Sequence, residues 1–122
     1  MTLTKKKFRY IAIFFPNNPP PNPGKFFDEF SRRYIDVFGA IEYFNSLSRI
    51  IKSNDSSNNV FILKCNLDSL SSTILSLYLL DQELMTVSIS GTLKQVKRKS
   101  HHFHMNFSEL QLSVKNSSFE QI

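Results

Sequence analysis

Residues 60–65, Val-Phe-Ile-Leu-Lys-Cys (VFILKC), decide the fold, because they form the clearest strand pattern in the chain and are apolar on both faces. A similar stretch, Phe8–Phe15 (FRYIAIFF), ends at Pro16 and contains Arg9 as its one charged residue. A strand that is apolar on both faces needs cover on both sides, so this stretch suits an inner strand better than an edge.

Between these two strands, apolar residues recur at the three- and four-residue spacing of a helix. They begin at Phe27 and run through Phe30, Tyr34, Val37, Phe38 and Ile41. Gly39 stands where a left-handed C-terminal cap is expected. The segment 43–52 most resembles a half-buried strand, and 53–59 (SNDSSNN) has the composition of a turn.

After residue 65 the pattern predicts a second helix and a last strand. Asn66 or Asp68 is expected to cap the helix. The last strand is expected over 85–94, where Val87 and Ile89 alternate with serines. The buried side of the helix is predicted to carry Leu67, Leu70, Ile74, Leu77 and Tyr78.

The resulting order of strand, helix, strand, strand, helix, strand predicts the fold class α/β, as an α+β sandwich. Two such halves are typical of a ferredoxin-like or RNA-recognition-like fold, with a four-stranded antiparallel sheet and helices on one face. We expect one domain over 1–100, with a Pro-rich loop at 16–24. Residues 101–122 form a C-terminal tail or a short extra element.

Charge is distributed unevenly around a formal net value of +5. Residues 1–27 contain five basic residues and no acid, and 84–122 contain five basic residues and two acids. A basic balance favours a polyanionic partner or an anionic surface. The single cysteine excludes an internal disulfide, and no apolar run approaches the length of a membrane span, so we expect no membrane partner.

The strongest chemical signal is Ser90-Gly91-Thr92-Leu93-Lys94, followed by Lys97-Arg98-Lys99. Gly91 permits a close backbone approach, the hydroxyls of Ser90 and Thr92 can donate, and the cations suit phosphate oxygens. The alternative is a Gly bulge at the end of an edge strand, with solvated lysines beyond it.

A second basic cluster, formed by Lys5, Lys6, Lys7 and Arg9, leads into the first strand. It is either an arm that binds phosphates without sequence preference, or a frayed terminus or nuclear-import signal. The sequence leaves open whether the two basic clusters form one surface.

The remaining candidates favour structural roles. Phe8, Tyr10 and Phe14 share one face of the first strand, and Phe61 lies on the third. Stacking on bases is conceivable, but core packing explains them better because the basic-Gly-aromatic signature is absent. Cys65 is predicted to be a small buried hydrophobe. His101, His102 and His104 are interpreted as a surface cluster rather than a metal site. We identify no catalytic residue and no metal ligand, since no nucleophile–base pair, phosphate-binding Gly loop or acidic cluster occurs.

Several of these segments resemble the Pop-five/Rpp-fourteen family of ribonuclease P and ribonuclease MRP subunits. The resemblance covers roughly residues 8–99, and only the Ser-Gly-Thr stretch is at all specific. The segments that carry it are Phe8-Arg9-Tyr10, Val37-Phe38-Gly39, Ile62-Leu63-Lys64-Cys65, and Ser90-Gly91-Thr92-Leu93-Lys94 with Lys97-Arg98-Lys99.

The resemblance implies a protein that binds and stabilises the catalytic RNA of ribonuclease P, and meets precursor tRNA indirectly. It also implies a TIM-barrel-like protein partner, magnesium bound by the RNA rather than by the protein, and a nuclear or nucleolar location (cytoplasmic in a prokaryote). The leucines outside the buried stripe of the second helix, Leu75, Leu79 and Leu80, are the predicted protein interface. Two alternatives remain: a paralogous scaffold subunit with little RNA contact, and an unrelated ferredoxin-like protein-interaction module.

Overall fold

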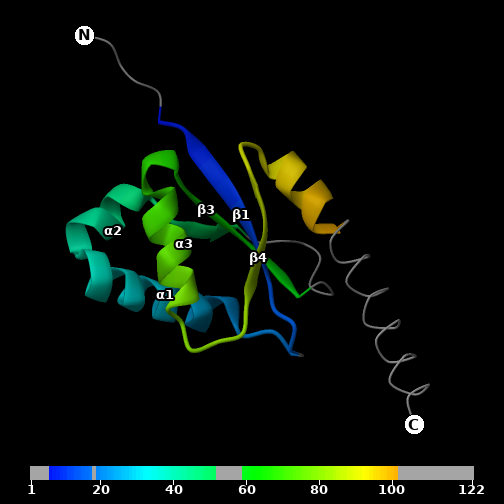
Figure 1. The fold of residues 1–122 in the computed structure, drawn as a ribbon, viewed down its shortest axis with the longest axis horizontal. Helices are drawn as coiled ribbons and strands as arrows, with labels where there is room; N and C mark the ends of the chain where they lie inside the picture. The colour runs from blue at the N-terminus through cyan, green and yellow to red at the C-terminus, as the bar shows by residue number, and fades with distance from the viewer. Residues whose placement is uncertain (1–5, 18, 52–58, 102–122) are drawn as a thin grey trace, which may run out of the picture.

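The computed structural model describes residues 6–17, 19–51 and 59–101, and its central element is a four-stranded sheet (Figure 1). A further helical segment covers residues 93–101. The labelled elements are β1 (Phe8–Phe14), α1 (Pro23–Phe38), α2 (Ala40–Ser46), β2 (Arg49–Ile51), β3 (Val60–Asn66), the 3-10 turn η1 (Leu67–Ser69), α3 (Leu70–Tyr78) and β4 (Met85–Ser90).

The strands are arranged in the order β2-β3-β1-β4, and all neighbours are antiparallel. The two stretches that are apolar on both faces, β1 and β3, are therefore the two inner strands. This position was predicted for β1. Ile11 lies opposite Leu63, and Ala12 lies opposite Ile62. The predicted four-stranded antiparallel sheet is confirmed.

One face of the sheet packs against α1, α2 and α3 (Figure 1). Side chains at alternate positions of the inner strands point into this layer and are fully shielded from solvent. The fully or almost fully buried residues of this core are Ile11, Ile13, Phe15, Phe26, Phe30, Tyr34, Leu63, Cys65 and Leu77. The aromatic residues meet edge to face, as between Phe15 and Phe26, whose ring centroids are 5.2 Å apart.

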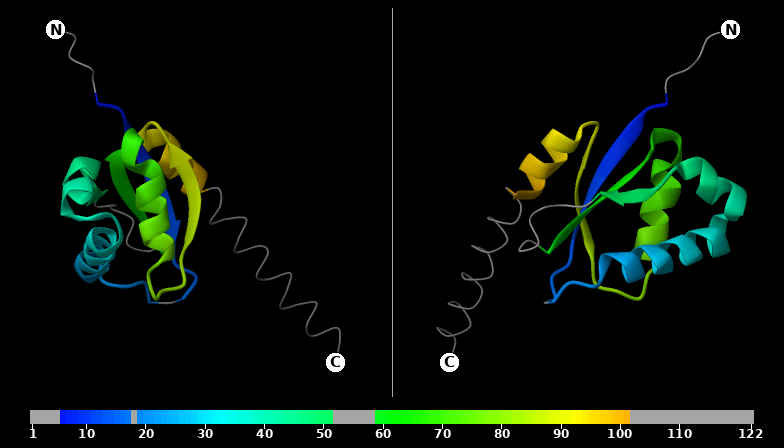
Figure 2. Two further views of the ribbon diagram at one scale, coloured as in Figure 1. Left: turned by 60° about the vertical axis from the view of Figure 1, so that its left-hand side comes forward. Right: turned by 180° about the vertical axis from the view of Figure 1, so that it is seen from behind.

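The opposite face is covered by the helix at residues 93–101, which lies across the sheet from α1–α3 (Figure 2). Val96 is 0% exposed and packs with Ala12 and Ile62. The prediction of helices on a single face holds for α1–α3 and is wrong for this helix.

The predicted last strand over 85–94 is therefore too long. It ends at Ser90, and Thr92 then caps the new helix by accepting a hydrogen bond from the Gln95 backbone N–H at 3.3 Å. Thr92 and Gln95 have the spacing of a capping box, in which a Thr is followed three residues later by Glu or Gln. This local signal, rather than the strand pattern, decides the backbone after Gly91.

The predicted strand over 43–52 is also wrong for most of its length. Residues 40–46 form α2, and only Arg49–Ile51 are extended. Gly39 causes the break between α1 and α2, since its φ of 93° and ψ of 161° end the first helix, while its N–H donates to the Ile35 carbonyl. Gly39 is the C-cap of α1, as predicted, but its backbone lies outside the left-handed helical region that was expected, and a second helix follows it directly.

Side-chain caps also determine where α1 and η1 begin. Asn22 Oδ1 accepts from the Gly24 and Lys25 backbone N–H groups, so the helix starts at Pro23, inside the predicted loop at 16–24. Asn66 accepts from the Asp68 N–H, as predicted. Tyr78 departs from the predicted buried side of α3: its ring is 55% exposed, and its hydroxyl shares a 2.7 Å hydrogen bond with Thr86.

The backbone at Gly39 leads to a first prediction. The substitution Gly39→Ala should lower the free energy of unfolding by about 1–3 kcal/mol, because side chains are strained in this region of φ and ψ. Space is not the cause, since an added Cβ at Gly39 would have no neighbour within 4 Å. Urea denaturation monitored by circular dichroism measures the change.

Gly91→Ala is the matched control for Gly39→Ala. An added Cβ at Gly91 would lie 3.6 Å from Arg9 Nη1, an ordinary contact, and stability should change by less than about 0.5 kcal/mol. Equal effects at the two positions would contradict the role given to Gly39.

Cys65 is 0% exposed, which confirms the prediction that it is buried. Burial raises the pKa of its thiol, and a hydrogen bond with Thr73 opposes that shift in part. Because the thiolate is the reactive form, the native protein should react with a thiol reagent at least about 100-fold more slowly than the urea-unfolded chain at neutral pH. A colorimetric thiol assay tests this, and equal rates in the two states would show that Cys65 is accessible.

Candidate nucleic-acid interface

The helix at residues 93–101 presents a basic surface to solvent while its other side packs on the sheet. Lys94, Lys97, Arg98 and Lys99 are all exposed. Val96 is fully buried, and Ser100 is 7% exposed, so the buried positions recur at helical spacing. Lys94, Arg98 and His101 follow one another at intervals of four and three residues, which places them on a common side of the helix.

One residue of the N-terminal basic cluster, Arg9, lies beside the turn that leads into this helix. Tyr10 on β1 lies opposite Ser90 on β4. A Cβ added at Gly91, the next residue, would lie 3.6 Å from Arg9 Nη1. Lys6 and Lys7 directly precede β1 and are exposed, whereas Lys5 lies outside the described residues. The position of Arg9 beside this turn is the point at which the two basic clusters approach one another.

The two hydroxyls of the Ser-Gly-Thr stretch differ in their surroundings. Ser90 is only 6% exposed, so its side chain belongs to the sheet rather than to the surface. Thr92 is exposed, and its oxygen accepts the capping hydrogen bond. Its own O–H proton can still be donated outward, because the cap uses only a lone pair. Among the two, Thr92 is the better placed to contact a phosphate.

The face of the sheet that carries the basic helix also contains a row of polar and aromatic side chains. Strand pairing aligns Arg49 with Lys64, Lys64 with Tyr10, and Tyr10 with Ser90, one residue from each strand. The Lys64 ammonium lies 4.2 Å from the centroid of the Phe8 ring and 5.9 Å from that of Tyr10. Such contacts are cation–π interactions.

Core packing, the interpretation favoured for the strand aromatics, holds for three of the four. Phe14 is 3% exposed, and Phe61 packs against Phe15 in the helix-side core, with ring centroids 4.8 Å apart. Tyr10 is half-buried and packs against the core cluster around Val96, whereas Phe8 is half-buried and belongs to neither cluster. The position of Lys64 beside them could not be found from the sequence, because it depends on the register between β1 and β3.

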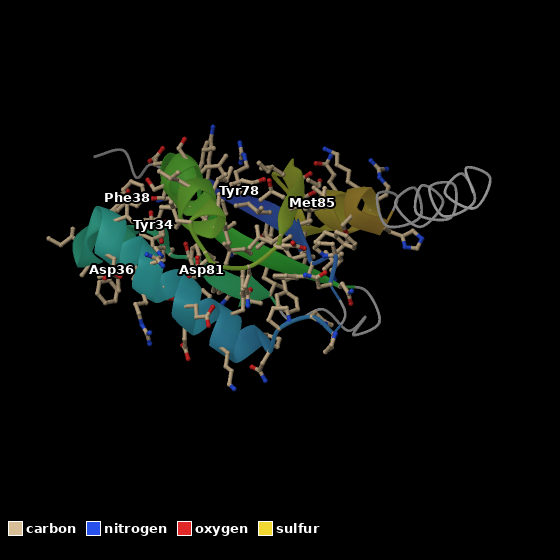
Figure 3. The ribbon with its side chains drawn as sticks, turned by 60° about the horizontal axis from the view of Figure 1, so that its bottom comes forward. Tyr34, Asp36, Phe38, Tyr78, Asp81 and Met85 are labelled. Atoms are coloured by element: carbon tan, nitrogen blue, oxygen red, sulfur yellow. The ribbon has the colours of Figure 1, made fainter. Side chains whose placement is uncertain are left out.

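Acidic residues lie instead on the side of the sheet that α1–α3 cover. Asp36 on α1 and Asp81 after α3 line a common pocket with Glu29, Arg32 and Arg33, and Figure 3 shows the two aspartates away from the helix at residues 93–101. No ion pair joins two residues of the described ranges. The basic surface thus has no neutralising carboxylate bound to it within the described chain.

The predicted protein interface is exposed in part. Leu75 and Leu79 on α3 are 48% and 41% exposed, but Leu80 is half-buried and packs against the core. Tyr78 on α3 and Ile89 on the edge strand β4 extend the exposed apolar surface. Met85, which is also exposed and is labelled with Tyr78 in Figure 3, pairs with Phe14 and so belongs to the other face of the sheet. A separate apolar group around α2 consists of Ile41, Phe44 and Leu47.

The described residues contain neither a metal-binding cluster nor a membrane-spanning helix. No group of three or more His, Cys, Asp or Glu side chains forms a metal-binding cluster there. His101 is exposed, and His102 and His104 lie outside the described ranges. Over the same residues, none of the helices has the length and apolarity that crossing a bilayer would require.

Comparison with known proteins adds no relative: no protein-family model matches the sequence, and a search of curated proteins finds no significant match. The functional argument therefore depends on the residues of this chain.

Proposed function

We propose that this protein is a non-catalytic, RNA-binding subunit of ribonuclease P, and that it serves the related ribonuclease MRP particle as well. The observation that carries the proposal is the position of Arg9 beside Gly91, at the turn that leads into the basic helix, with Lys6 and Lys7 exposed just before β1. The strand order β2-β3-β1-β4 supports the assignment to a ferredoxin-like, RNA-recognition-like sandwich.

In this proposal the protein acts by electrostatics and shape. Lysines and arginines displace counterions from the RNA backbone, which gives affinity without reading sequence. Two clusters held at a fixed separation by the sheet bring two stretches of backbone together and so stabilise one RNA fold. The RNA carries the magnesium and cleaves the 5′ leader of precursor tRNA, while the protein binds no cofactor of its own.

The exposed apolar surface of α3 and β4 is the proposed docking site for the TIM-barrel-like subunit. Leu75 and Leu79 lie beside Tyr78, and the hydrogen bond from Tyr78 to Thr86 joins the helix to β4. The surface is thus formed by two elements that are already held together. This apolar surface lies on the side of the sheet that α1–α3 cover, so the protein partner and the RNA can bind at the same time.

Two alternatives lead to different expectations. A paralogous scaffold subunit would use the same apolar surface and bind RNA weakly. An unrelated ferredoxin-like interaction module would gain support if the basic clusters lay on opposite sides of the fold; the position of Arg9 beside Gly91 favours the RNA-binding proposal instead. Purifying the tagged chain from its own cells and sequencing the associated RNA separates these possibilities, because only the leading proposal expects enrichment of ribonuclease P or MRP RNA.

The basic helix leads to a quantitative prediction. If about five phosphates are contacted, the slope of log K against log salt should be near −3.5 to −4.5. Replacing Lys97, Arg98 and Lys99 together by Gln should flatten that slope by about 2–3 units. Filter binding of ribonuclease P RNA over a range of salt concentrations measures both slopes.

A matched triple variant on α1 is the control for the salt experiment. Lys25, Arg32 and Arg33 lie on α1, on the other side of the sheet from the basic helix. Their replacement by Gln removes as much positive charge as the replacement of Lys97, Arg98 and Lys99. The slope of log K against log salt for this α1 variant should equal that of the unmodified protein. Equal flattening by both triples would mean that net charge alone, and not the helix at residues 93–101, determines binding.

The apolar surface leads to a separate prediction. Leu75→Asp with Leu79→Asp should abolish binding to the TIM-barrel-like subunit in size-exclusion mixing experiments, because charges would be desolvated in the interface. Folding should persist, since both leucines are already 41% exposed or more. The control is Ile41→Asp with Phe44→Asp on α2; loss of the partner with this pair alone would move the docking site to α2.

A further inference from the structure

We propose that Phe8 and Tyr10, with Lys64 and Arg49 beside them, form a stacking site for unpaired bases of an RNA strand. The inference rests on the proposed RNA-binding function and adds a second mode of contact to it. The basic helix binds the backbone, whereas this end of the sheet binds base faces.

The four side chains share one face of the sheet. Lys64 is the cross-strand partner of both Tyr10 and Arg49, and its ammonium lies over the Phe8 ring. Phe8 and Tyr10 are two residues apart on β1, so their side chains emerge on the same side about 7 Å apart. That spacing is close to twice the thickness of an aromatic ring, which leaves room for one flat base against either ring.

Among the described residues, no helix covers this end of the face, whereas the basic helix covers the other end. The basic helix buries Ala12, Phe14 and Ile62 completely or almost completely, with Val96 as the central contact. Phe8, Tyr10 and Lys64 remain half-buried, and Arg49 is exposed. Figure 2 shows β1 extending beyond the helix toward the N-terminus. Aromatic side chains held on a strand and left partly open are suited to a ligand with flat apolar faces.

The charges favour a nucleotide over an apolar ligand or a protein segment. The row across the sheet contains Arg49 and Lys64 and no acid, and Lys6 and Lys7 lead into it. Lys64 has a flexible stem, so its ammonium can leave the Phe8 ring for a phosphate while a base takes its place. Base–aromatic stacking combined with nearby cations is the general mode of binding single-stranded nucleic acid.

The strand must be unpaired, because in an RNA duplex the base faces are already stacked on one another. The site therefore predicts a difference between single-stranded and duplex RNA that phosphate contacts alone do not produce. It also predicts little base preference, since every base has an aromatic face.

Binding measurements with the full chain test this inference. The probe is a fluorescent single-stranded RNA of about ten nucleotides, compared with a duplex of the same length. Phe8→Leu with Tyr10→Leu retains apolar packing but removes the rings. It should weaken single-strand binding by about 5- to 100-fold and leave duplex binding unchanged. Phe44→Leu is the control, because Phe44 is an exposed aromatic of α2 on the other layer and should have no effect.

Photocrosslinking of the unmodified protein gives a second readout that needs no variant. With 4-thiouridine in the single strand, adducts should map to Phe8, Tyr10 or Lys64. Adducts confined to residues 93–101, with single-strand binding by the Leu variant equal to that of the unmodified protein, would overturn the stacking site and leave the proposed function standing. Failure of the unmodified protein to bind either RNA would overturn both.

Discussion

The structure depends on one constraint: β1 and β3 are apolar on both faces, so neither can be stable unless something covers each side. The helices α1–α3 cover one side and the basic helix covers the other. The second cover is small, because it consists of one short helix centred on Val96. This division of the sheet into a heavily covered face and a partly covered face determines where every candidate site lies.

The sequence predicted β1 as an inner strand, the end of a helix at Gly39 and the buried cysteine, because each depends on neighbours within a few residues. It failed where a local cap outweighed the period of the apolar residues. Thr92 and Gln95 turned an expected strand into a helix, and Gly39 allowed a second helix where Tyr43 and Phe44 suggested a strand. Both failures have the same physical origin, since one residue with special backbone or capping chemistry overrides a weak pattern of hydrophobicity.

The candidate site was predictable only in its parts. The sequence contained both basic clusters and the strand aromatics, but their relation depends on strand order and register. Only strand pairing brings Lys64 beside Tyr10, and Arg9 beside the turn at Gly91 that leads into the basic helix. The Phe8 and Phe61 side chains, which look equivalent in the sequence, lie on opposite faces of the sheet, so one faces the proposed ligand side and the other the core.

The basic helix has a double role, since its inner side shields the sheet and its outer side carries the cations. Under the proposed RNA-binding function, RNA would bind only the form in which the helix is docked, so the affinity would scale with the docked fraction. RNA would in turn stabilise the docked helix and the sheet beneath it against unfolding. Val96, although it faces the sheet, would then contribute to the binding energetics as the lysines do.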